Sequence, residues 1–227
     1  MPILKDFKFH SPGSLPQAIK SLEEARSSLL LAGGTFAINY LKKSAKYPSD
    51  VISLKNIKEL RGIKDLGKEL WIGSMVTISE LLETKAIHEN FPSLYDACFK
   101  LATTPIRNMA TIGGNIASRF YWVDLPGVLI SLGAVLEIIS GNKKTSCRLE
   151  DFFKEKPLQK TIISGIIMPK EKRDSFYFRH TRTSQDVDVP FLGLAFSCVN
   201  DNGKLNDSRL VVNTTLSFPV LLEKTAS

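Results

Sequence analysis

Two pairs of adjacent glycines, each placed inside an apolar stretch, constrain the fold of this chain more than any other feature. The first pair lies in "LAGGTF", residues 31–36, and the second lies in "ATIGGNIA", residues 110–117. Adjacent glycines weaken a helix or a strand by roughly 1 kcal/mol each relative to alanine. Each pair therefore predicts a tight turn or a close approach of the backbone to a ligand. A small polar residue, Thr35 or Asn115, follows each pair.

Glycine turns of this kind let successive backbone N–H groups converge on an anion, because no Cβ atom blocks the approach. The sequence contains neither G-x-G-x-x-G nor the P-loop pattern, so it indicates neither a Rossmann dinucleotide site nor a P-loop. Taken singly, each pair is more typical of a structural turn. Because the two pairs lie in separate parts of the chain, we expect them to face each other across one cleft, where a pyrophosphate would contact both.

The length and composition are those of a soluble globular protein. A chain of 227 residues can form one large domain or two to three small ones, and a content of 43% hydrophobic and 23% charged residues is ordinary. The net charge of +7 is dispersed apart from a lysine cluster at 42–46, and no aromatic residues are interleaved with it. A nucleic-acid-binding function is therefore disfavoured.

The sequence also lacks the patterns of membrane and metal proteins. No apolar run reaches the ~20 residues of a membrane span, and the first ten residues contain no signal-peptide core. Cys98, Cys147 and Cys198 lie about fifty residues apart, and the three histidines are equally scattered. No metal or iron–sulfur ligand set is visible, so we expect free thiols in a cytoplasmic protein.

The first 55 residues predict a small α/β unit. Strands are expected at 7–10, 29–32 and 51–55, the last two parallel, with one helix after Ser14 as N-cap and another that includes residues 37–41. This order is a strand–glycine turn–helix–strand crossover.

Residues 56–170 predict a larger unit. Two short strands at 62–65 and 69–73 precede a helix with a capping box, formed by Thr77 and Glu80. A helix over 91–103 should end at Thr104-Pro105, because the residue before proline avoids the α region. The segments that complete this unit are a helix at 124–132, a hairpin of 134–140 with 144–153, and a strand at 161–169. From residue 170 onward, three strands are expected at 175–182, 190–200 and 204–218, with few helical segments to cover them.

Five stretches carry a resemblance to a known family, in its order and spacing. They are "LLLAGGTFAINYLK", "LWIGSMVTISELL", "PSLYDACFKLATTPIRNMATIGGNIA", "WVDLPGVLISLGAVLEI" and "TIISGIIMP". They resemble the FAD-binding (medium) subunit of molybdenum hydroxylases, the flavoprotein of the xanthine dehydrogenase and carbon monoxide dehydrogenase group. The resemblance covers residues 1–170 well and 170–215 loosely.

The resemblance implies an α+β fold of the PCMH type, shared with vanillyl-alcohol oxidase-like flavoproteins. Its domains would be two α/β FAD-binding subdomains, 1–55 and 56–170, and a shortened C-terminal antiparallel sheet subdomain, 171–227. Members of the family usually continue for some sixty residues beyond this point. We therefore expect either a naturally short subunit or a truncated C-terminal subdomain whose apolar sheet face would need a partner.

The resemblance also implies a set of FAD-binding residues. The pyrophosphate would lie between the two glycine stretches. The backbone of the first stretch would hold one side of it, and residues of the second would form the opposite side. The first set is Ala32, Gly33, Gly34, Thr35, Phe36 and Ala37, and the second set is Thr111, Gly113, Gly114 and Asn115. Many relatives have an acidic residue where this chain has Phe36. That difference alters the local polarity but leaves the backbone anion site intact.

Further residues are implied around the ribityl chain and the isoalloxazine ring. Asp124 matches the family aspartate that bonds the ribityl hydroxyls, although it is also placed to cap a helix. Leu101 and Ile163 would sandwich the ring, with Ala102 on the same wall, although either apolar residue suits a plain core. Arg179 falls where the family commonly has a lysine near the flavin, and its alternative is a surface charge. Arg107 and Asn108 are expected to bond carbonyls of the second glycine turn, with a direct FAD contact as the alternative.

The implied function is electron transfer. Substrate would be hydroxylated at a molybdenum cofactor on a large partner subunit, and electrons would pass through [2Fe–2S] clusters of a small subunit to FAD, then to NAD or another acceptor. No catalytic side chain is required, because the redox chemistry belongs to the cofactor. Two alternatives remain: a stand-alone flavoprotein oxidoreductase of the same fold, and a non-catalytic scaffold subunit that has lost FAD.

Overall fold

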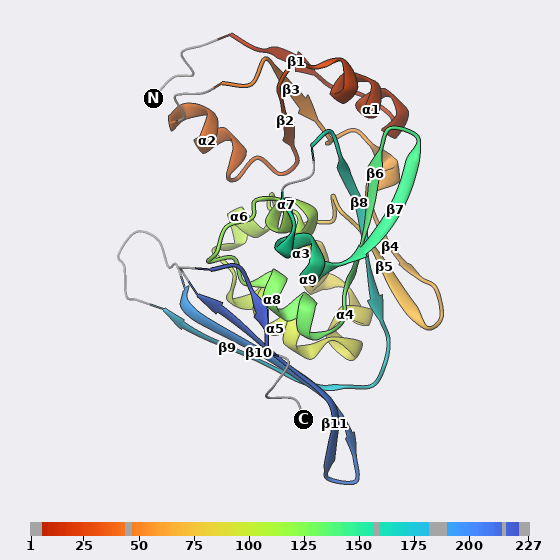
Figure 1. Ribbon diagram of the computed structural model, residues 1–227, viewed down its shortest axis with the longest axis vertical. Helices are drawn as coiled ribbons and strands as arrows, with labels where there is room; N and C mark the ends of the chain where they lie inside the picture. The colour runs from red at the N-terminus through yellow and green to blue at the C-terminus, as the bar shows by residue number, and fades with distance from the viewer. Residues whose placement is uncertain (1–5, 44–46, 157–158, 182–189, 215–216, 223–227) are drawn as a thin grey trace.

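Three β-sheets follow one another along the chain (Figure 1). The computed structural model describes residues 6–43, 47–156, 159–181, 190–214 and 217–222. The first sheet is parallel, with strand order β1-β3-β2. Its elements are β1 (Lys8–His10), α1 (Leu15–Glu24), β2 (Ser28–Leu31), α2 (Ala37–Lys43) and β3 (Asp50–Ser53). The predicted parallel crossover is confirmed.

The second sheet is antiparallel and has the strand order β4-β5-β8-β6-β7. Its strands are β4 (Ile63–Asp65), β5 (Glu69–Gly73), β6 (Val135–Ser140), β7 (Lys143–Arg148) and β8 (Ile162–Pro169). Most of the helices lie between this sheet and the third one (Figure 1). These helices are α3 (Ile78–Glu83), α4 (Lys85–Asn90), α5 (Pro92–Lys100), α6 (Thr104–Arg107), α7 (Ile112–Ala117), α8 (Leu125–Ser131) and α9 (Leu149–Lys154), and the 3-10 turn η1 (Lys58–Leu60) precedes β4.

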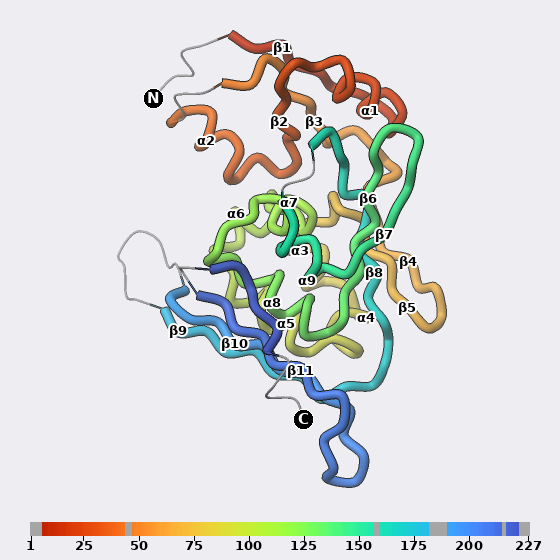
Figure 2. The backbone as a smooth tube through the Cα atoms, viewed as in Figure 1, coloured from red at the N-terminus to blue at the C-terminus, as the bar shows by residue number. Residues whose placement is uncertain are grey.

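The third sheet is antiparallel and lies at the opposite end of the molecule from the first (Figure 2). Its strands are β9 (Asp174–Thr181), β10 (Pro190–Asp201), β11 (Lys204–Thr214) and β12 (Val220–Leu221). The three predicted strands are confirmed, while residues 182 and 215–216 within their predicted ranges lie outside the described residues. The mixed α+β class is confirmed, and the domain boundaries at 55 and 170 stay a prediction.

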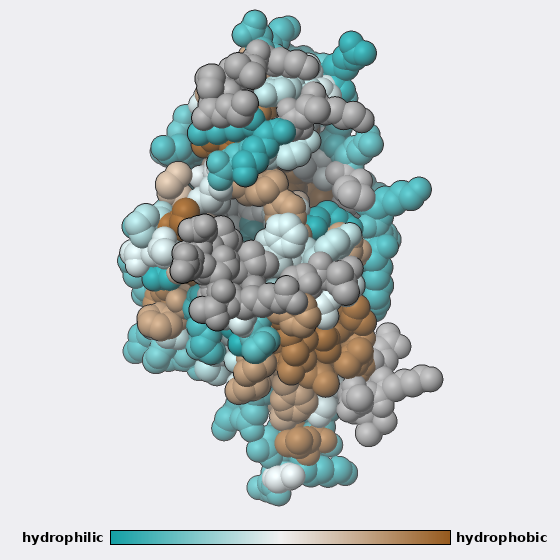
Figure 3. Space-filling view, turned by 90° about the vertical axis from the view of Figure 1, so that its left-hand side faces the viewer, coloured by the Kyte–Doolittle hydropathy of each residue, from teal (hydrophilic) through white to brown (hydrophobic). Residues whose placement is uncertain are grey.

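The main core lies between the second and third sheets. All seven residues of α8 are buried, because this helix packs against β10 and β11. The inner face of the third sheet contributes Tyr177, Ala195 and Val211, each less than 5% exposed. On the outer face, Phe176 is 58% and Phe178 42% exposed. Figure 3 views the molecule from the left-hand side of Figure 1 and shows hydrophobic residues gathered on the lower part of that side.

The second glycine stretch corrects the expectation of a turn, because Gly113 and Gly114 lie inside helix α7. Thr111 caps this helix, and its Oγ1 atom accepts a hydrogen bond from the backbone N–H of Gly114 at 3.1 Å. A Cβ atom on Gly113 would lie 2.7 Å from the carbonyl oxygen of Ser74. Close packing against residue 74, rather than a reversal of the chain, therefore requires glycine here.

Two smaller expectations were also wrong. The helix over 91–103 ends earlier, at Lys100, and Thr104-Pro105 starts α6, where proline suits the first turn of a helix. Residues 149–153 form α9 rather than the end of a strand, since Leu149 and Phe153 are buried at helical spacing and two acidic residues occupy the first turn. The prediction that Ser14 is the N-cap of α1 is confirmed, although its side chain makes no capping hydrogen bond.

The capping box at α3 is confirmed and gives a first testable expectation. The backbone N–H of Thr77 donates to Glu80 Oε2 at 2.6 Å, and the N–H of Glu80 donates to Thr77 Oγ1 at 3.2 Å. Thr77→Ala should lower the free energy of unfolding by about 1 kcal/mol, measured by urea denaturation. Ser14→Ala is the matched control and should change stability much less. Equal effects of the two substitutions would contradict the capping role.

Candidate functional site

The two glycine pairs lie against each other. A Cβ atom on Gly33 would lie 1.8 Å from the carbonyl oxygen of Met109, so the first stretch contacts the backbone just before the second. A Cβ atom on Gly114 would lie 3.7 Å from that of Ala32. Both stretches therefore border the same space, although the first follows β2 and the second forms helix α7.

The first stretch leaves the carboxyl end of β2 and turns into α2. Gly34 has a φ of +76°, a conformation that glycine adopts at low cost. Five consecutive backbone N–H groups here donate to no acceptor among the described residues. They belong to Gly33, Gly34, Thr35, Phe36 and Ala37. Because backbone donors normally find a partner, a row of five beside a cavity is suited to an anion.

The second stretch offers a different chemistry. The N–H of Gly113 donates to Ser74 O at 2.9 Å and that of Asn115 to Thr111 O at 2.9 Å, and the N–H of Gly114 is used by the helix cap. These amides therefore serve the chain itself. The Oδ1 atom of Asn115 is buried and has no hydrogen-bond partner among the described residues. On this side a side chain, rather than main-chain nitrogen, is available to a ligand.

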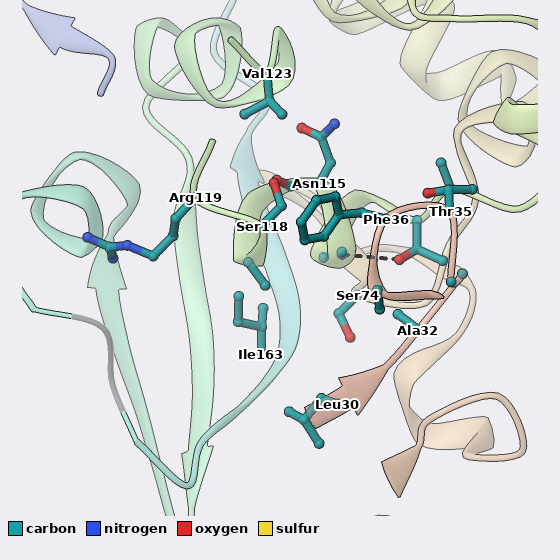
Figure 4. Close-up of a pocket in the computed structure, with 18 of the residues that line it drawn as sticks. Leu30, Ala32, Thr35, Phe36, Ser74, Asn115, Ser118, Arg119, Val123 and Ile163 are labelled. Atoms are coloured by element: carbon teal, nitrogen blue, oxygen red, sulfur yellow. Dashed lines mark hydrogen bonds between the residues drawn. The ribbon is translucent and has the colours of Figure 1, made fainter. Parts of the chain in front are cut away.

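A cavity of about 620 Å³ lies between the two stretches, within the size range of small-molecule sites. Figure 4 shows Thr35 and Ala32 on one side, Asn115 and Ser118 on the other, and the ring of Phe36 between them. The predicted site residues that line the cavity are Ala32, Gly33, Gly34, Thr35, Phe36, Ala37, Leu101, Thr111, Gly113, Gly114, Asn115 and Ile163.

Leu101 and Ile163 form apolar parts of the wall. Leu101 is 9% exposed and belongs to the main core, and Ile163 is half-buried and packs against that core. The two interpretations from the sequence, cavity wall and plain core, therefore hold together for both residues. Each presents an apolar surface to the cavity while its other side is fixed by core packing.

Three predicted site residues, Ala102, Asp124 and Arg179, do not line this cavity. Asp124 is 6% exposed, and its Oδ1 atom accepts a hydrogen bond from the hydroxyl of Tyr177. Burial, and then the neighbouring carboxylate, raises the pKa of Tyr177, which keeps this hydroxyl protonated. Asp124 precedes α8 with helical backbone angles and makes no side-chain cap, so the capping alternative was wrong.

Arg179 points from β9 toward the same carboxylate. Its Nη1 atom lies 3.6 Å from Asp124 Oδ2 and donates to the carbonyl oxygen of Lys100 at 2.6 Å. The side chain is only 9% exposed, so the alternative of a surface charge was wrong. Ala102 follows Leu101 with a φ of +43°. Both residues thus lie next to the wall residue Leu101, Arg179 through its bond to the preceding carbonyl and Ala102 in sequence.

Two aromatic residues at the cavity, Phe120 and Trp122, were not singled out from the sequence, whereas Phe36 was. The ring of Phe36 meets that of Phe120 edge-on at 4.3 Å between centroids, and Phe120 stacks on Trp122 at 4.5 Å. All three line the cavity. They connect the first glycine stretch to the loop after α7. The run Phe120-Tyr121-Trp122 was the available signal, but nothing local showed which way these rings face.

Arg119 also lines the cavity and was missed. Its guanidinium donates to the carbonyl oxygens of Phe152 at 2.6 Å and Glu155 at 2.8 Å, at the end of α9. Burial lowers the pKa of this guanidinium, which nevertheless stays charged at neutral pH. A cation at the last carbonyls of a helix stabilises that end. Arg119 therefore fixes α9 beside the cavity.

The site combines an anion-binding row of amides, one amide side chain and apolar walls. This combination fits an elongated ligand with a negatively charged centre and planar rings. Among the described residues, no group of three or more His, Cys, Asp or Glu side chains is arranged to hold a metal ion. Within the same residues, none of the helices has the length and apolar character needed to cross a bilayer.

The chain is similar in sequence to a known family and to several relatives. Residues 5–171 match the family described as the FAD binding domain in molybdopterin dehydrogenase. The carbon monoxide dehydrogenase medium chain of Hydrogenophaga pseudoflava is 30% identical over 148 residues, which is 65% of this chain and 52% of that one. The xanthine dehydrogenase FAD-binding subunit of Escherichia coli O157:H7 is 28% identical over 221 residues, covering 93% and 75%.

A solved structure has the same fold. Carbon monoxide dehydrogenase from Hydrogenophaga pseudoflava superposes with a TM-score of 0.91 at 24% identity, covering 98% of this chain and 79% of that chain. The fold class expected from the resemblance is therefore confirmed. The match to the medium-chain sequence named first spans about half of that relative's length.

Proposed function

The chain belongs to the family of FAD-binding domains of molybdopterin dehydrogenases, and from this premise we propose that it is the FAD-binding electron-transfer subunit of a molybdenum hydroxylase. The observation that carries the proposal is the row of five backbone amides that have no acceptor in the described part of the chain and that line one cavity with Asn115. A flavin dinucleotide has the diphosphate that such a row recognises.

The residues present fit FAD. The amides of 33–37 would hold the pyrophosphate, and the buried Asn115 Oδ1 atom would accept a hydrogen bond from the cofactor. Leu101 and Ile163 would contact a planar ring on its faces. When bound, FAD supplies the redox chemistry. Asp124 accepts a hydrogen bond from Tyr177, Arg179 donates to the carbonyl oxygen of Lys100, and neither residue lines the cavity. Direct cofactor contacts by these two residues therefore form no part of the proposal.

The chain's own contribution is binding, orientation and exclusion of water. The walls are apolar, and Phe36, Phe120 and Trp122 add aromatic surface at the cavity. Electron transfer through a bound flavin needs a fixed cofactor rather than an acid or base from the protein. A rigid wall and an anion site are what the described residues provide.

Partners follow from the proposed role. The relatives' names describe a medium chain and an FAD-binding subunit, which are components of larger enzymes. In the proposed complex a large subunit with the molybdenum cofactor and a small [2Fe–2S] subunit deliver electrons to this chain, which passes them to NAD or another acceptor in the cytoplasm. The net charge of +7 suits acidic partner surfaces.

The test is a titration of the purified full chain with FAD, FMN and ADP, followed by flavin fluorescence and by competition. FAD should bind with one molecule per chain, and ADP should compete because it shares the diphosphate. FMN, with a single phosphate, should bind at least roughly 10-fold more weakly. A chain that binds no FAD would favour the scaffold alternative. Flavin-loaded chain that never co-purifies with molybdenum and iron–sulfur subunits would favour the stand-alone flavoprotein.

A further inference from the structure

Four successive carbonyl groups, at the end of α5 and just after it, accept hydrogen bonds from two arginines, one close in sequence and one 79 positions away. Arg107, on α6, reaches three of them through its Nη1 atom, at 3.3, 2.9 and 3.0 Å. Arg179, on β9, reaches the fourth at 2.6 Å. The carbonyls bonded to Arg107 are those of Phe99, Leu101 and Ala102, and the one bonded to Arg179 is that of Lys100.

These carbonyls need external partners. Phe99 and Lys100 lie in the last turn of α5, where carbonyl groups have no N–H partner within the helix and carry its negative dipole end, and Leu101 and Ala102 follow the helix. Ala102, the last of the four, has a φ of +43°, a left-handed conformation that is unfavourable for a residue with a Cβ atom. At the turn between α5 and α6, the two guanidinium groups thus supply partners to carbonyls beside a left-handed residue.

The same turn carries a cavity wall. Leu101 lies at its centre, lines the cavity and is 9% exposed. A shift of the backbone here would move the Leu101 side chain relative to Ile163, the other apolar wall residue. The position of the wall thus depends on bonds made by side chains that do not themselves line the cavity.

The two arginines are held differently. The Nη2 atom of Arg107 also donates to Thr104 Oγ1 at 3.0 Å, so its planar group bonds four oxygens at one end of α6. Arg179 uses Nη1 for one carbonyl and faces Asp124 at 3.6 Å. The contacts of Arg107 therefore need the fork of a guanidinium, whereas the contact with the Lys100 carbonyl needs a single positively charged donor.

We propose that Arg107 and Arg179 are positioning residues for the cofactor cavity, which fix the α5–α6 turn and thereby the wall at Leu101. This inference rests on the proposed function, in which the cavity holds FAD. It assigns to Arg179 a role through the backbone of Lys100, in place of a direct charge effect on the flavin. It assigns Arg107 to this turn, in place of the second glycine stretch.

The experiment compares lysine and glutamine substitutions at both positions. Arg107→Lys and Arg107→Gln should both weaken FAD binding about 10-fold or more, because one ammonium group cannot bond four oxygens. Arg179→Gln should weaken FAD binding similarly, whereas Arg179→Lys should stay within about 3-fold of the unsubstituted chain. The matched control is Arg209→Gln on β11, where the arginine pairs with Asp207 at 2.9 Å and does not line this cavity; FAD binding should be unchanged.

Two readouts separate positioning from general stability. Hydrogen exchange of the 99–106 backbone, measured without cofactor, should accelerate in Arg107→Gln while the second sheet stays protected, and the visible absorption spectrum of bound FAD should change shape. Unchanged exchange at 99–106, or equal effects of the two lysine variants on FAD affinity, would overturn the inference. An unsubstituted chain that binds no FAD would overturn the proposed function instead, even if exchange at 99–106 accelerates as expected.

Discussion

Gly33→Ala should abolish FAD binding and lower the free energy of unfolding by about 3 kcal/mol. The added Cβ atom would lie 1.8 Å from the carbonyl oxygen and 2.7 Å from the carbonyl carbon of Met109. Both are backbone atoms, so no side-chain rotation relieves the clash and the two glycine stretches must separate. Their separation displaces the five amides of 33–37 from the cavity. Urea denaturation and FAD titration by fluorescence measure the two effects.

Gly13→Ala is the matched control for this substitution. A Cβ atom there would meet only the Oε1 atom of Gln17, at 3.8 Å, which is an ordinary contact. The control should therefore keep both its stability and its FAD affinity. If Gly33→Ala binds FAD as tightly as the unsubstituted chain, the contact between the two stretches does not support the cofactor site.

Asp124→Ala should lower the free energy of unfolding by about 3–5 kcal/mol, the range for breaking a buried ion pair by removing one partner. Asp124 and Arg179 are 8% and 9% exposed at their side chains, so water does not replace the missing carboxylate. The hydroxyl of Tyr177, 4% exposed, would lose its acceptor at the same time. Urea denaturation at neutral pH measures this loss.

Asp124→Asn separates the two parts of this effect. The asparagine oxygen still accepts the hydrogen bond from Tyr177 but carries no charge for Arg179. Its destabilisation should therefore be clearly smaller than that of Asp124→Ala. Equal losses for the two variants would show that the charge, rather than the hydrogen bond, dominates. A negligible loss for both would contradict the buried network.

The sequence predicted the parts of the fold that depend on local patterns. Alternating apolar residues gave the strands of the second and third sheets, and Thr77 with Glu80 gave a helix start that the structure confirms. Glycine spacing also located the cavity, because adjacent glycines are costly unless backbones meet, as Gly33 and Met109 do. Each of these patterns lies within a short segment of the chain.

Other features depend on residues far apart in the sequence. Glycine propensity argues against helix α7, but packing on Ser74 and the cap by Thr111 override it. The sequence position of Asp124 suited a helix cap or a contact with the ribityl hydroxyls. Only the fold brings Tyr177, 53 positions later, against its carboxylate. The bond from Arg179 to the end of α5 likewise spans 79 positions. No local sequence pattern predicts such contacts.

The aromatic stack at the cavity gives the protein a built-in optical probe. The chain has two tryptophans, and Trp122 belongs to this stack at 38% exposure. The other, Trp71, is 9% exposed within the second sheet and donates from its indole nitrogen to Glu137 at 2.7 Å. Intrinsic tryptophan fluorescence therefore comes from one indole beside the cavity, Trp122, and one within the second sheet, Trp71. Changes in the environment of Trp122 can be followed by fluorescence without any added label.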